Sequence, residues 1–246
     1  MRRFFIDEHA IRENNAVITG NLFCHMTRVL RLKIGTRVLL SDGIGRRHVG
    51  VIESIGKENL VIRLAESTSE PERPRGPLIT LYQGLPKGSK MEFILQKCTE
   101  LGVNSLIPFV AGRSIAQIPQ DRETERLNRW RRIVAEAARQ SNRASIPELR
   151  PVLDFSKLLD SADQAVKLLL WEEEKSNRLK SVLGSLPLPE TVAVMVGPEG
   201  GLSKDEVTAA TKAGFIPVTL GSRILRTETA GMALLAVLQF FWGDMG

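Results

Sequence analysis

The sequence predicts an α/β protein in two parts, a small β-barrel followed by a larger domain whose parallel sheet is covered by helices. A chain of 246 residues is long enough for two modest domains. Residues 71–77 (PERPRGP) neither continue a helix nor pair as a central strand, and they predict a linker. Short strand-like runs precede this stretch, whereas strands and helices alternate after it. The predicted domains are therefore 1–70 and 78–246.

The first 70 residues combine several short strands with one helix, the pattern that predicts the barrel. Asp42-Gly43 and Lys57-Glu58-Asn59 are turn signals between the last three strands. Asn21 is positioned to cap the helix. The apolar residues that recur near helical spacing behind it are Leu22, Met26, Val29 and Leu30. The expected strands are 3–6, 16–19, 36–40, 48–54 and 60–64.

After residue 77 the elements alternate regularly, which predicts a parallel sheet covered on both faces. The expected strands are 78–83, 105–110, 165–171, 191–196 and 217–220. The expected helices are 89–101, 122–140, 176–183, 204–213 and 228–241. Ligands of such sheets bind at the carboxyl ends of the strands. The buried positions of the first helix include Cys98, which we expect to be a core thiol.

The charge distribution favours nucleic acid as a partner. The net charge is +6, and arginine supplies 23 of the 34 basic residues. Guanidinium groups bind phosphate with paired hydrogen bonds and stack on bases, although a merely basic surface would explain the same bias. Residues 151–246 have a net charge of −3, so the positive charge is confined to the first 150 residues. The last third is therefore unsuited to a polyanion.

Composition also excludes several classes of protein. Two distant cysteines, Cys24 and Cys98, provide neither a disulfide framework nor a zinc site, so we expect no metal. The apolar run 232–242 is shorter than the roughly 20 residues that span a bilayer. The first residues, MRRFFIDEHA, lack the apolar segment of a secretory signal. We expect a cytoplasmic protein without a membrane anchor.

Two glycine-containing loops follow predicted strands. The run 197–203 (GPEGGLS) lets the backbone approach a ligand closely, and Ser203 with Glu206 forms a capping box for the next helix. It is neither a dinucleotide fingerprint nor a P-loop, and a simple strand-to-helix turn is the plainer interpretation. The run 220–230 (LGSRILRTETA) similarly leads into the last helix, with Thr227 as the expected cap. The two loops could face each other across one pocket, or each could be an ordinary loop.

Basic residues gather on two predicted helices. The run 136–143 (EAARQSNR) ends a long basic helix, and Arg143 lies beyond the expected helix end, where it can reach a neighbouring site. His25, Arg28 and Arg31 have the i, i+3, i+6 spacing of one helix face. Such faces are usually solvated, and His25 could instead be packed in the core.

These motifs together resemble the 16S ribosomal RNA uridine-N3 methyltransferases of the RsmE type, in the SPOUT superfamily. The matching runs are GPEGGLSKDE, LGSRILRTETA, EAARQSNR, QKCTELGV and the N-terminal HMTRVLR. The resemblance covers nearly the whole chain in the family's order. It implies a homodimer with an N-terminal PUA-like barrel and a C-terminal SPOUT domain containing a trefoil knot, although chains as a rule do not knot.

The resemblance also implies an activity, a cofactor and roles for residues. The expected reaction is transfer of a methyl group from S-adenosylmethionine to N3 of a uridine in the 16S rRNA of the small ribosomal subunit, at uracil 1498. From the needs of that chemistry, Arg143 is the candidate group that orients the base and stabilises charge. Glu228 and Glu136 are candidate proton acceptors, with a water or an RNA group as the alternative. The implied cofactor-binding residues are Leu170, Gly197, Glu199, Gly200, Gly201, Leu220, Gly221, Ile224, Leu225, Arg226, Thr229 and Ala230. The candidate RNA-binding residues are Arg2, Arg3, His25, Arg28 and Arg31, and the basic residues of 122–132.

Two other functions fit the same sequence. A SPOUT ribose 2′-O-methyltransferase shares the cofactor loops but positions a hydroxyl group. A non-catalytic RNA-binding ribosome assembly factor needs the basic surface but no cofactor site. No Pro-Cys nucleophile motif of cytosine-C5 methyltransferases is visible.

Overall fold

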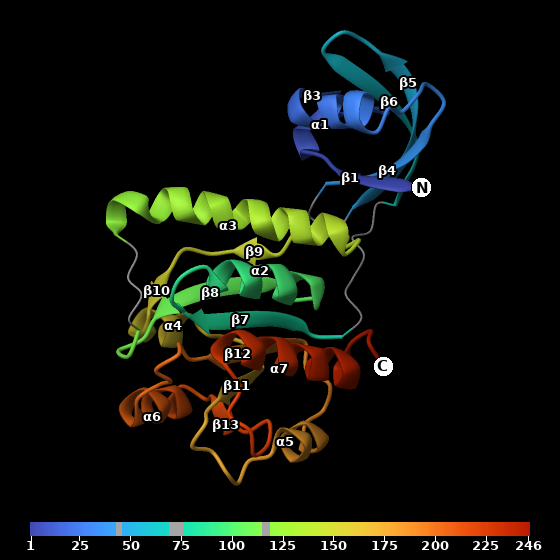
Figure 1. Cartoon of the computed structure of the whole chain (residues 1–246). Helices are drawn as coiled ribbons and strands as arrows, with labels where there is room; N and C mark the ends of the chain where they lie inside the picture. Colours follow the sequence, from blue (N-terminus) through green and yellow to red (C-terminus); the bar gives the residue numbers. More distant parts are fainter. Residues whose placement is uncertain (43–45, 69–75, 115–118) are drawn as a thin grey trace. The chain divides into compact units, whose positions relative to one another are not determined.

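The computed structural model describes residues 1–42, 46–68, 76–114 and 119–246, which form two compact units (Figure 1). Unit 1 comprises Met1–Arg73 and Ala138–Ile146, and unit 2 comprises Pro74–Ala137 and Pro147–Gly246. The stretch 138–146, which the sequence placed in the second domain, thus groups with the N-terminal residues. Most of the expected linker, 71–75, and Gly43 of the expected turn lie outside the described residues.

Unit 1 contains a six-stranded sheet in the order β1-β4-β5-β6-β3-β2. β1 pairs with β4 in parallel, and the other pairs are antiparallel. The five predicted strands are present, and the short β2 was not predicted. The strands are β1 (Arg2–Phe5), β2 (Ile11–Arg12), β3 (Asn15–Thr19), β4 (Arg37–Ser41), β5 (Arg47–Ile55) and β6 (Asn59–Thr68).

The long β5–β6 hairpin bends through two register shifts, between Val49 and Gly50 and between Ile52 and Ser54. Gly50 is required at the first shift, because a Cβ there would lie 2.4 Å from Ile62 Cγ2. Bulges of this kind increase the twist of a hairpin, which lets its inner face wrap a core. The buried residues of this core include Phe4, Ile18, Met26, Leu40 and Ile62.

The helical segment of unit 1 differs from its prediction. Helix α1 (Gly20–Cys24) has Thr19 as its N-cap and continues directly into a single π-helical segment, η2 (His25–Val29). The expected cap at Asn21 is therefore wrong. Because the π turn changes the angular spacing of side chains, Met26 is buried but Val29 is 68% exposed instead of facing the core. A short 3-10 helix, η1 (Glu8–Ala10), was not predicted.

Unit 2 contains a wholly parallel sheet in the order β10-β8-β7-β12-β11-β13, with β9 also paired to β8. This confirms the predicted parallel sheet, and the two short strands β9 and β10 are additions. The strands are β7 (Leu78–Gly84), β8 (Ser105–Val110), β9 (Glu148–Leu149), β10 (Leu153–Asp154), β11 (Val166–Leu170), β12 (Thr191–Val196) and β13 (Ile216–Val218).

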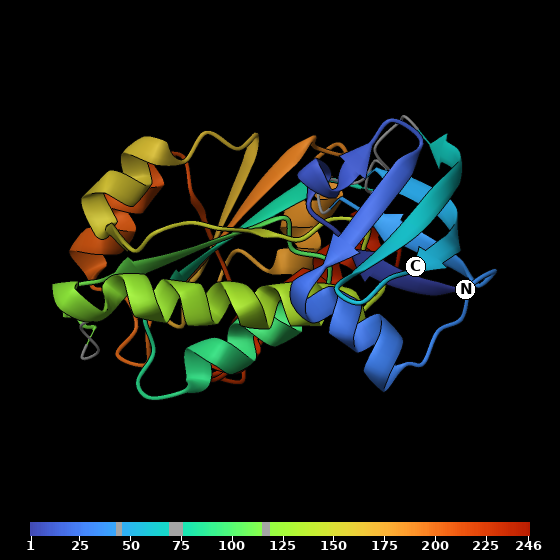
Figure 2. The ribbon, with the colours of Figure 1, turned by 90° about the horizontal axis from the view of Figure 1, so that it is seen from above.

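Helices cover this sheet, and the two views show their layers (Figures 1 and 2). α2 and α7 pack against each other, and α7 contacts β12. Residues of α4 and α6 share a core with Tyr82, Phe109 and Met195 of the strands. Cys98 of α2 is fully buried, as expected for a core thiol, and burial raises its pKa to about 12. The helices are α2 (Lys90–Glu100), α3 (Gln120–Gln140), α4 (Phe155–Ser161), α5 (Leu179–Ser185), α6 (Lys204–Lys212) and α7 (Thr227–Trp242).

Register aligns the carboxyl ends of four neighbouring strands. Val196 of β12 pairs with Gln83 of β7 and with Leu170 of β11, and Leu170 pairs with Val218 of β13. The loops that follow β11, β12 and β13 therefore leave the sheet side by side. This edge is where an open parallel sheet binds its ligand.

Candidate functional site

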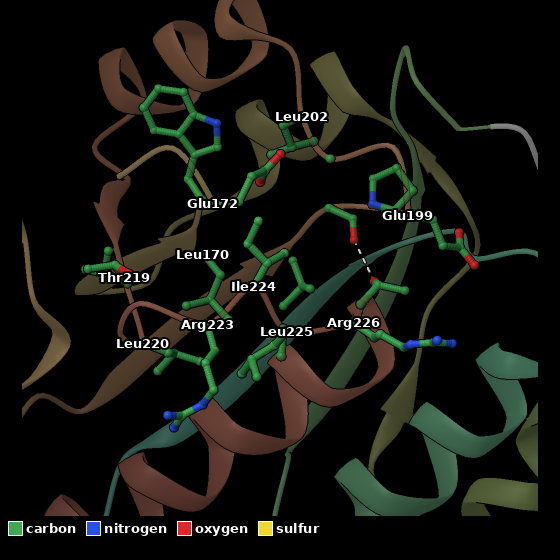
Figure 3. Close-up of a pocket in the computed structure, with 18 of the residues that line it drawn as sticks. Leu170, Glu172, Glu199, Leu202, Thr219, Leu220, Arg223, Ile224, Leu225 and Arg226 are labelled. Carbon is green, nitrogen blue, oxygen red and sulfur yellow. Dashed lines mark hydrogen bonds between the residues drawn. The ribbon is translucent and has the colours of Figure 1, made fainter. Parts of the chain in front are cut away.

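A cavity of about 560 Å³ lies at the carboxyl edge of the unit 2 sheet (Figure 3). Its walls come from the ends of β11, β12 and β13, the loops after them and the first turn of α7. This volume falls within the roughly 300–1,000 Å³ typical of small-molecule sites. The two glycine-containing loops 197–202 and 219–226 both line it, so they face one pocket as expected.

The cavity has an apolar part and a charged end. Leu170, Leu220, Ile224 and Leu225 supply apolar side chains, and Glu199 lies toward the opposite end from Leu220 (Figure 3). The side chain of Ile224 is 82% exposed although it is large and apolar. A residue of this kind at a cavity mouth is suited to cover a bound ligand.

At two glycines in the loop after β12 a side chain would be strained or crowded. Gly201 has φ +67°, a left-handed backbone conformation that L side chains rarely adopt. A Cβ on Gly197 would lie 3.2 Å from the backbone carbon of Gly201. The loop thus brings its backbone to the cavity wall, which leaves amide and carbonyl groups to contact a ligand.

Thr227 fastens this loop to the sheet and to α7. Its Oγ1 donates to the carbonyl of Gly197 at 2.6 Å and accepts from Gln83 Nε2 at 2.9 Å. Gln83 is completely buried at the end of β7. The expected role of Thr227 as the helix cap is wrong, because Arg226 occupies the N-cap position and Thr227 begins the helix.

The capping box predicted at the start of α6 is confirmed. Ser203 Oγ accepts from the amide of Glu206 at 3.2 Å, and Glu206 Oε2 accepts from the amide of Ser203 at 2.8 Å. Glu206 Oε1 also accepts from the amide of Gly112 at 2.8 Å. The carboxylate of Glu206 therefore joins the loop after β8 to the loop after β12.

A cluster of three charged groups marks one end of the cavity. Lys90 Nζ lies 3.0 Å from Glu199 Oε1 and 3.4 Å from Glu228 Oε2. The amide of Lys87 donates to both carboxylate oxygens of Glu199, at 3.1 and 3.3 Å. Lys90 and Glu199 line the cavity, and Glu228 follows the lining residue Thr227. These contacts connect α2, the loop after β12 and α7.

Most of the residues expected to bind a cofactor do line the cavity. They are Leu170, Gly197, Glu199, Gly201, Leu220, Gly221, Ile224, Leu225, Arg226 and Ala230. Gly200 and Thr229 are not among the lining residues. A Cβ on Gly200 would instead lie 3.0 Å from the carbonyl oxygen of Arg113, so this glycine serves packing between loops.

Other lining residues were missed by the sequence analysis. They are Lys90, Glu172, Val196, Pro198, Leu202, Val218, Thr219, Ser222, Arg223 and Thr227. Most of them lie next to predicted residues in the two loops. Extending the predicted site to the whole of each loop would therefore have included them. Lys90 had no such signal, because it lies far away in the sequence, at the start of α2.

Arg143 lies just beyond the end of α3, as predicted, and belongs to unit 1. Asn142 has φ +57°, and the amides of Asn142 and Arg143 donate to the carbonyls of Arg139 and Ala138 at 3.3 and 3.0 Å. This pair of hydrogen bonds is a Schellman motif, which ends a helix and fixes the direction of the next residues. Glu136, the other predicted carboxylate, is exposed on α3.

Arg3 holds the turn that contains Arg143. Its guanidinium donates to the carbonyl of Asn142 and, at 2.8 Å, to the carbonyl of Arg143. Ser41 Oγ donates to the carbonyl of Ala144 at 2.6 Å. These bonds tie the segment after α3 to β1 and β4 within unit 1. Arg3 was predicted as a phosphate contact, and these hydrogen bonds give it a structural role in the chain itself.

The other candidate RNA-binding residues are exposed. Arg2, His25, Arg28 and Arg31 all lie on the surface of unit 1, so the alternative that His25 packs in the core is wrong. The predicted sharing of one α-helical face by His25, Arg28 and Arg31 is also wrong, because residues 25–29 are π-helical and Arg31 has φ +51°. Their contact with RNA stays a prediction.

On the long basic helix α3, several arginines have partners within the protein. Arg129 pairs with Glu92 at 2.8 Å, and Arg126 lies over the ring of Trp130. No group of His, Cys, Asp or Glu that could hold a metal ion occurs in the part of the chain that the structure describes. Within that same part, no helix is long and apolar enough to cross a membrane.

The fold and the cavity define an RNA methyltransferase of two domains. A family model described as an RNA methyltransferase domain matches residues 73–239, and one described as an RNA methyltransferase PUA domain matches residues 18–65. The chain is 33% identical over 248 residues to ribosomal RNA small subunit methyltransferase E of Bacillus subtilis, covering 98% of this chain and 96% of that protein. The chain belongs to the ribosomal RNA small subunit methyltransferase E family, which confirms the resemblance inferred from its motifs.

Solved structures support the same assignment. The chain is similar to a ribosomal RNA small subunit methyltransferase E from Neisseria gonorrhoeae bound to S-adenosylmethionine, with 33% identity, full coverage of both chains and a TM-score of 0.86. It is also similar to a methyltransferase from Legionella pneumophila in complex with the same cofactor, with 30% identity, 98% coverage of each chain and a TM-score of 0.84.

Proposed function

We propose that this chain transfers the methyl group of S-adenosylmethionine to N3 of a uridine in 16S rRNA, at uracil 1498, in the small ribosomal subunit. The observation that carries this proposal is the cavity at the carboxyl edge of the sheet, built from two glycine-containing loops in a chain of this family. The basic N-terminal part suits an RNA substrate. We expect the enzyme to act in the cytoplasm, where ribosomes are assembled.

The residues of the cavity fit the proposed cofactor. The apolar side chains of Leu170, Leu220 and Leu225 suit the flat faces of adenine, and backbone groups of the glycine loops suit its polar edge. When bound, S-adenosylmethionine supplies a methyl group carried on a positively charged sulfur. Because Gly201 has no side chain, the loop can approach this cofactor closely. We further propose that these loops form the trefoil knot implied by the family resemblance.

The protein must orient the uracil, accept its N3 proton and stabilise charge on its carbonyl oxygens. Arg143 is proposed to orient the base and stabilise that charge, because a guanidinium group stays protonated at ordinary pH and is a poor base. Glu228 is preferred to Glu136 as the proton acceptor. Glu228 is adjacent to a residue of the cavity wall and its Oε2 is buried, whereas Glu136 is exposed on α3.

We also propose that two copies of the chain form a homodimer through α7. Val237, Phe240 and Phe241 are 38%, 68% and 46% exposed, and they recur at helical spacing on one face of this helix. An exposed apolar stripe on an otherwise buried helix indicates an interface. A second copy is the proposed occupant, because the family resemblance implies a dimer. We propose in addition that Arg143 of one copy completes the site beside the cofactor of the other.

The activity is tested by nucleoside analysis of 16S rRNA from a deletion strain, before and after this protein is added to its small ribosomal subunits. The proposal predicts that N3-methyluridine is absent from the strain and appears on addition. A methyl group on ribose would instead identify a ribose 2′-O-methyltransferase. Failure of the protein to bind S-adenosylmethionine in calorimetry would indicate a non-catalytic assembly factor.

The shared site is tested by mixing two inactive variants, Arg143→Ala and Gly201→Val. Gly201→Val is chosen because Gly201 lines the cavity and has φ +67°. Subunit exchange should restore one working site in each mixed dimer, and activity should reappear. If heterodimers form and remain inactive, Arg143 acts within its own chain.

A further inference from the structure

Lys90 connects the cavity to two carboxylates, although none of the sequence motifs includes it. It occupies the first turn of α2 and lines the cavity. Its Nζ lies 3.0 Å from Glu199 Oε1 and 3.4 Å from Glu228 Oε2. An ammonium group has three N–H donors, so contacts with two carboxylates leave one donor for a ligand in the cavity.

The two carboxylates differ in how many hydrogen-bond donors already contact them. Glu199 is held by Lys90 and by the amide of Lys87. Burial acts to raise the pKa of Glu199, but its own amide, Lys90 and the amide of Lys87 outweigh burial, so its pKa lies below the ordinary value. Glu199 is therefore a permanent counter-ion, and its hydrogen bond with Lys90 is the main reason that the pKa of Lys90 is raised.

Glu228 is contacted by fewer donors than Glu199. Its side chain is 17% exposed, and Lys90 is its ion-pair partner. Its Oε2 is buried without a well-aligned hydrogen bond among the described residues. Glu228 thus places an acceptor directly beside the donor of Lys90.

This acceptor–donor pair is complementary to one edge of uracil. Uracil has an N3–H donor flanked by two carbonyl acceptors, so N3–H matches the carboxylate and a neighbouring carbonyl matches the ammonium. Cytosine has an unprotonated N3, which would face the carboxylate as a second acceptor. Mismatches of this kind, which leave charged groups unpaired, discriminate strongly between bases.

We propose that Lys90 and Glu228 read the N3–H and the adjoining carbonyl of the target uridine, with Lys90 as the specificity-determining donor. This inference rests on the proposed function and adds Lys90 to the residues that act on the target uridine. As N3 gains the methyl group, its proton passes to the carboxylate of Glu228, and the electron pair of the broken methyl–sulfur bond stays on sulfur. The positive charge on sulfur and the negative charge on Glu228 are lost together, so the step is balanced. Lys90 stabilises the charge that develops on the carbonyl oxygen.

The charge of the cluster suits a neutral base edge and also the ammonium, but not the carboxylate, of the cofactor's amino-acid end. One lysine between two carboxylates has a net charge of −1, which disfavours a carboxylate ligand. A neutral imide with an acidic N–H suits such a site better. Recognition of the cofactor's amino-acid end is the competing outcome of the test.

The test compares Lys90→Met with Lys87→Met, a matched loss of charge on an exposed side chain three residues earlier, before α2 begins. Equilibrium binding is measured to small ribosomal subunits that carry uridine or cytidine at the target position, and cofactor binding is measured by calorimetry. Lys90→Met should weaken binding to the uridine form about tenfold or more and reduce the preference over cytidine, while Glu228 still disfavours the unprotonated N3 of cytosine. Its cofactor affinity should match that of Lys87→Met. An unchanged preference for uridine, or a loss of cofactor affinity alone, would overturn the proposal.

A second variant, Glu228→Gln, keeps an acceptor oxygen but cannot take up the proton at neutral pH. Its thermal unfolding should match the wild type, and its binding to the uridine form should change less than about threefold. Its single-turnover methylation rate should fall about 10²–10⁴-fold, the range for loss of a general base. Methylation at the wild-type rate would refute the role of Glu228. If wild-type protein methylates nothing, the proposed function fails, while the uridine preference in binding still tests Lys90.

Discussion

Replacing Thr227 with valine tests whether one buried hydroxyl holds the cofactor loop in place. Valine has nearly the same shape but neither donates nor accepts a hydrogen bond. The substitution removes the 2.6 Å bond to the carbonyl of Gly197 and the 2.9 Å bond from Gln83. Thr227 is 7% exposed, so water cannot readily replace these partners.

The expected loss of stability follows from these two bonds. Leaving a buried polar group without its partner costs about 1–3 kcal/mol. Gln83 Nε2 also donates to the carbonyl of Gly84 at 3.0 Å, which limits the loss on that side. We expect a decrease of about 2–3 kcal/mol in the free energy of unfolding, or a fall of about 4–12 °C in Tm. Because Gly197 lines the cavity, a loosened loop should also weaken S-adenosylmethionine binding about tenfold.

Thr229→Val is the matched control. It removes an equivalent hydroxyl two residues later, but Thr229 is exposed and is not a lining residue. Calorimetric unfolding and calorimetric titration with S-adenosylmethionine are run on both variants. Equal Tm values and equal cofactor affinities for the two variants would refute the idea that Thr227 fastens the loop.

Three further predictions concern other parts of the molecule. Arg28→Ala and Arg31→Ala should weaken rRNA binding and reduce its salt dependence while leaving cofactor affinity unchanged, because each removes a predicted phosphate contact; salt titrations that match those of the wild type would exclude this surface. Arg3→Met should speed hydrogen exchange in residues 138–146 about tenfold or more, because the carbonyls of that turn lose their donors, whereas an unchanged exchange rate would show that Arg3 is dispensable there. Ser203→Ala should remove the capping box of α6 at a cost of about 1 kcal/mol, and an unchanged Tm would contradict that assignment.

The sequence predicted the regular elements of unit 2 well because their patterns are local. Strands such as 191–196 are continuous apolar runs of the kind found in buried parallel sheets. The Ser203–Glu206 capping box is likewise a short-range signal, since both partners lie within one helical turn. The short strands β9 and β10 escaped notice because two residues are too few to show any periodicity.

Local patterns failed where the backbone departs from regular geometry. The helix near residue 20 was predicted with α-helical spacing, and the π-helical residues 25–29 changed which side chains face the core. The caps at Asn21 and Thr227 were each misplaced by a residue or two, which is the ordinary uncertainty of helix ends. Thr227 instead found partners 30 and 144 positions away in the chain.

The sequence by itself determined the class of fold, the two glycine-containing loops of the cavity and the family, because glycine spacing, capping residues and apolar runs are encoded within short stretches. Only the tertiary structure decided which side chains meet. Lys90 reaches Glu199 and Glu228 because α2, the loop after β12 and α7 converge at one end of the cavity. Arg3 reaches the carbonyls next to Arg143 because β1 and the end of α3 belong to one compact unit. Such contacts join residues more than a hundred positions apart, and no local pattern records them, because their geometry arises only when the chain packs.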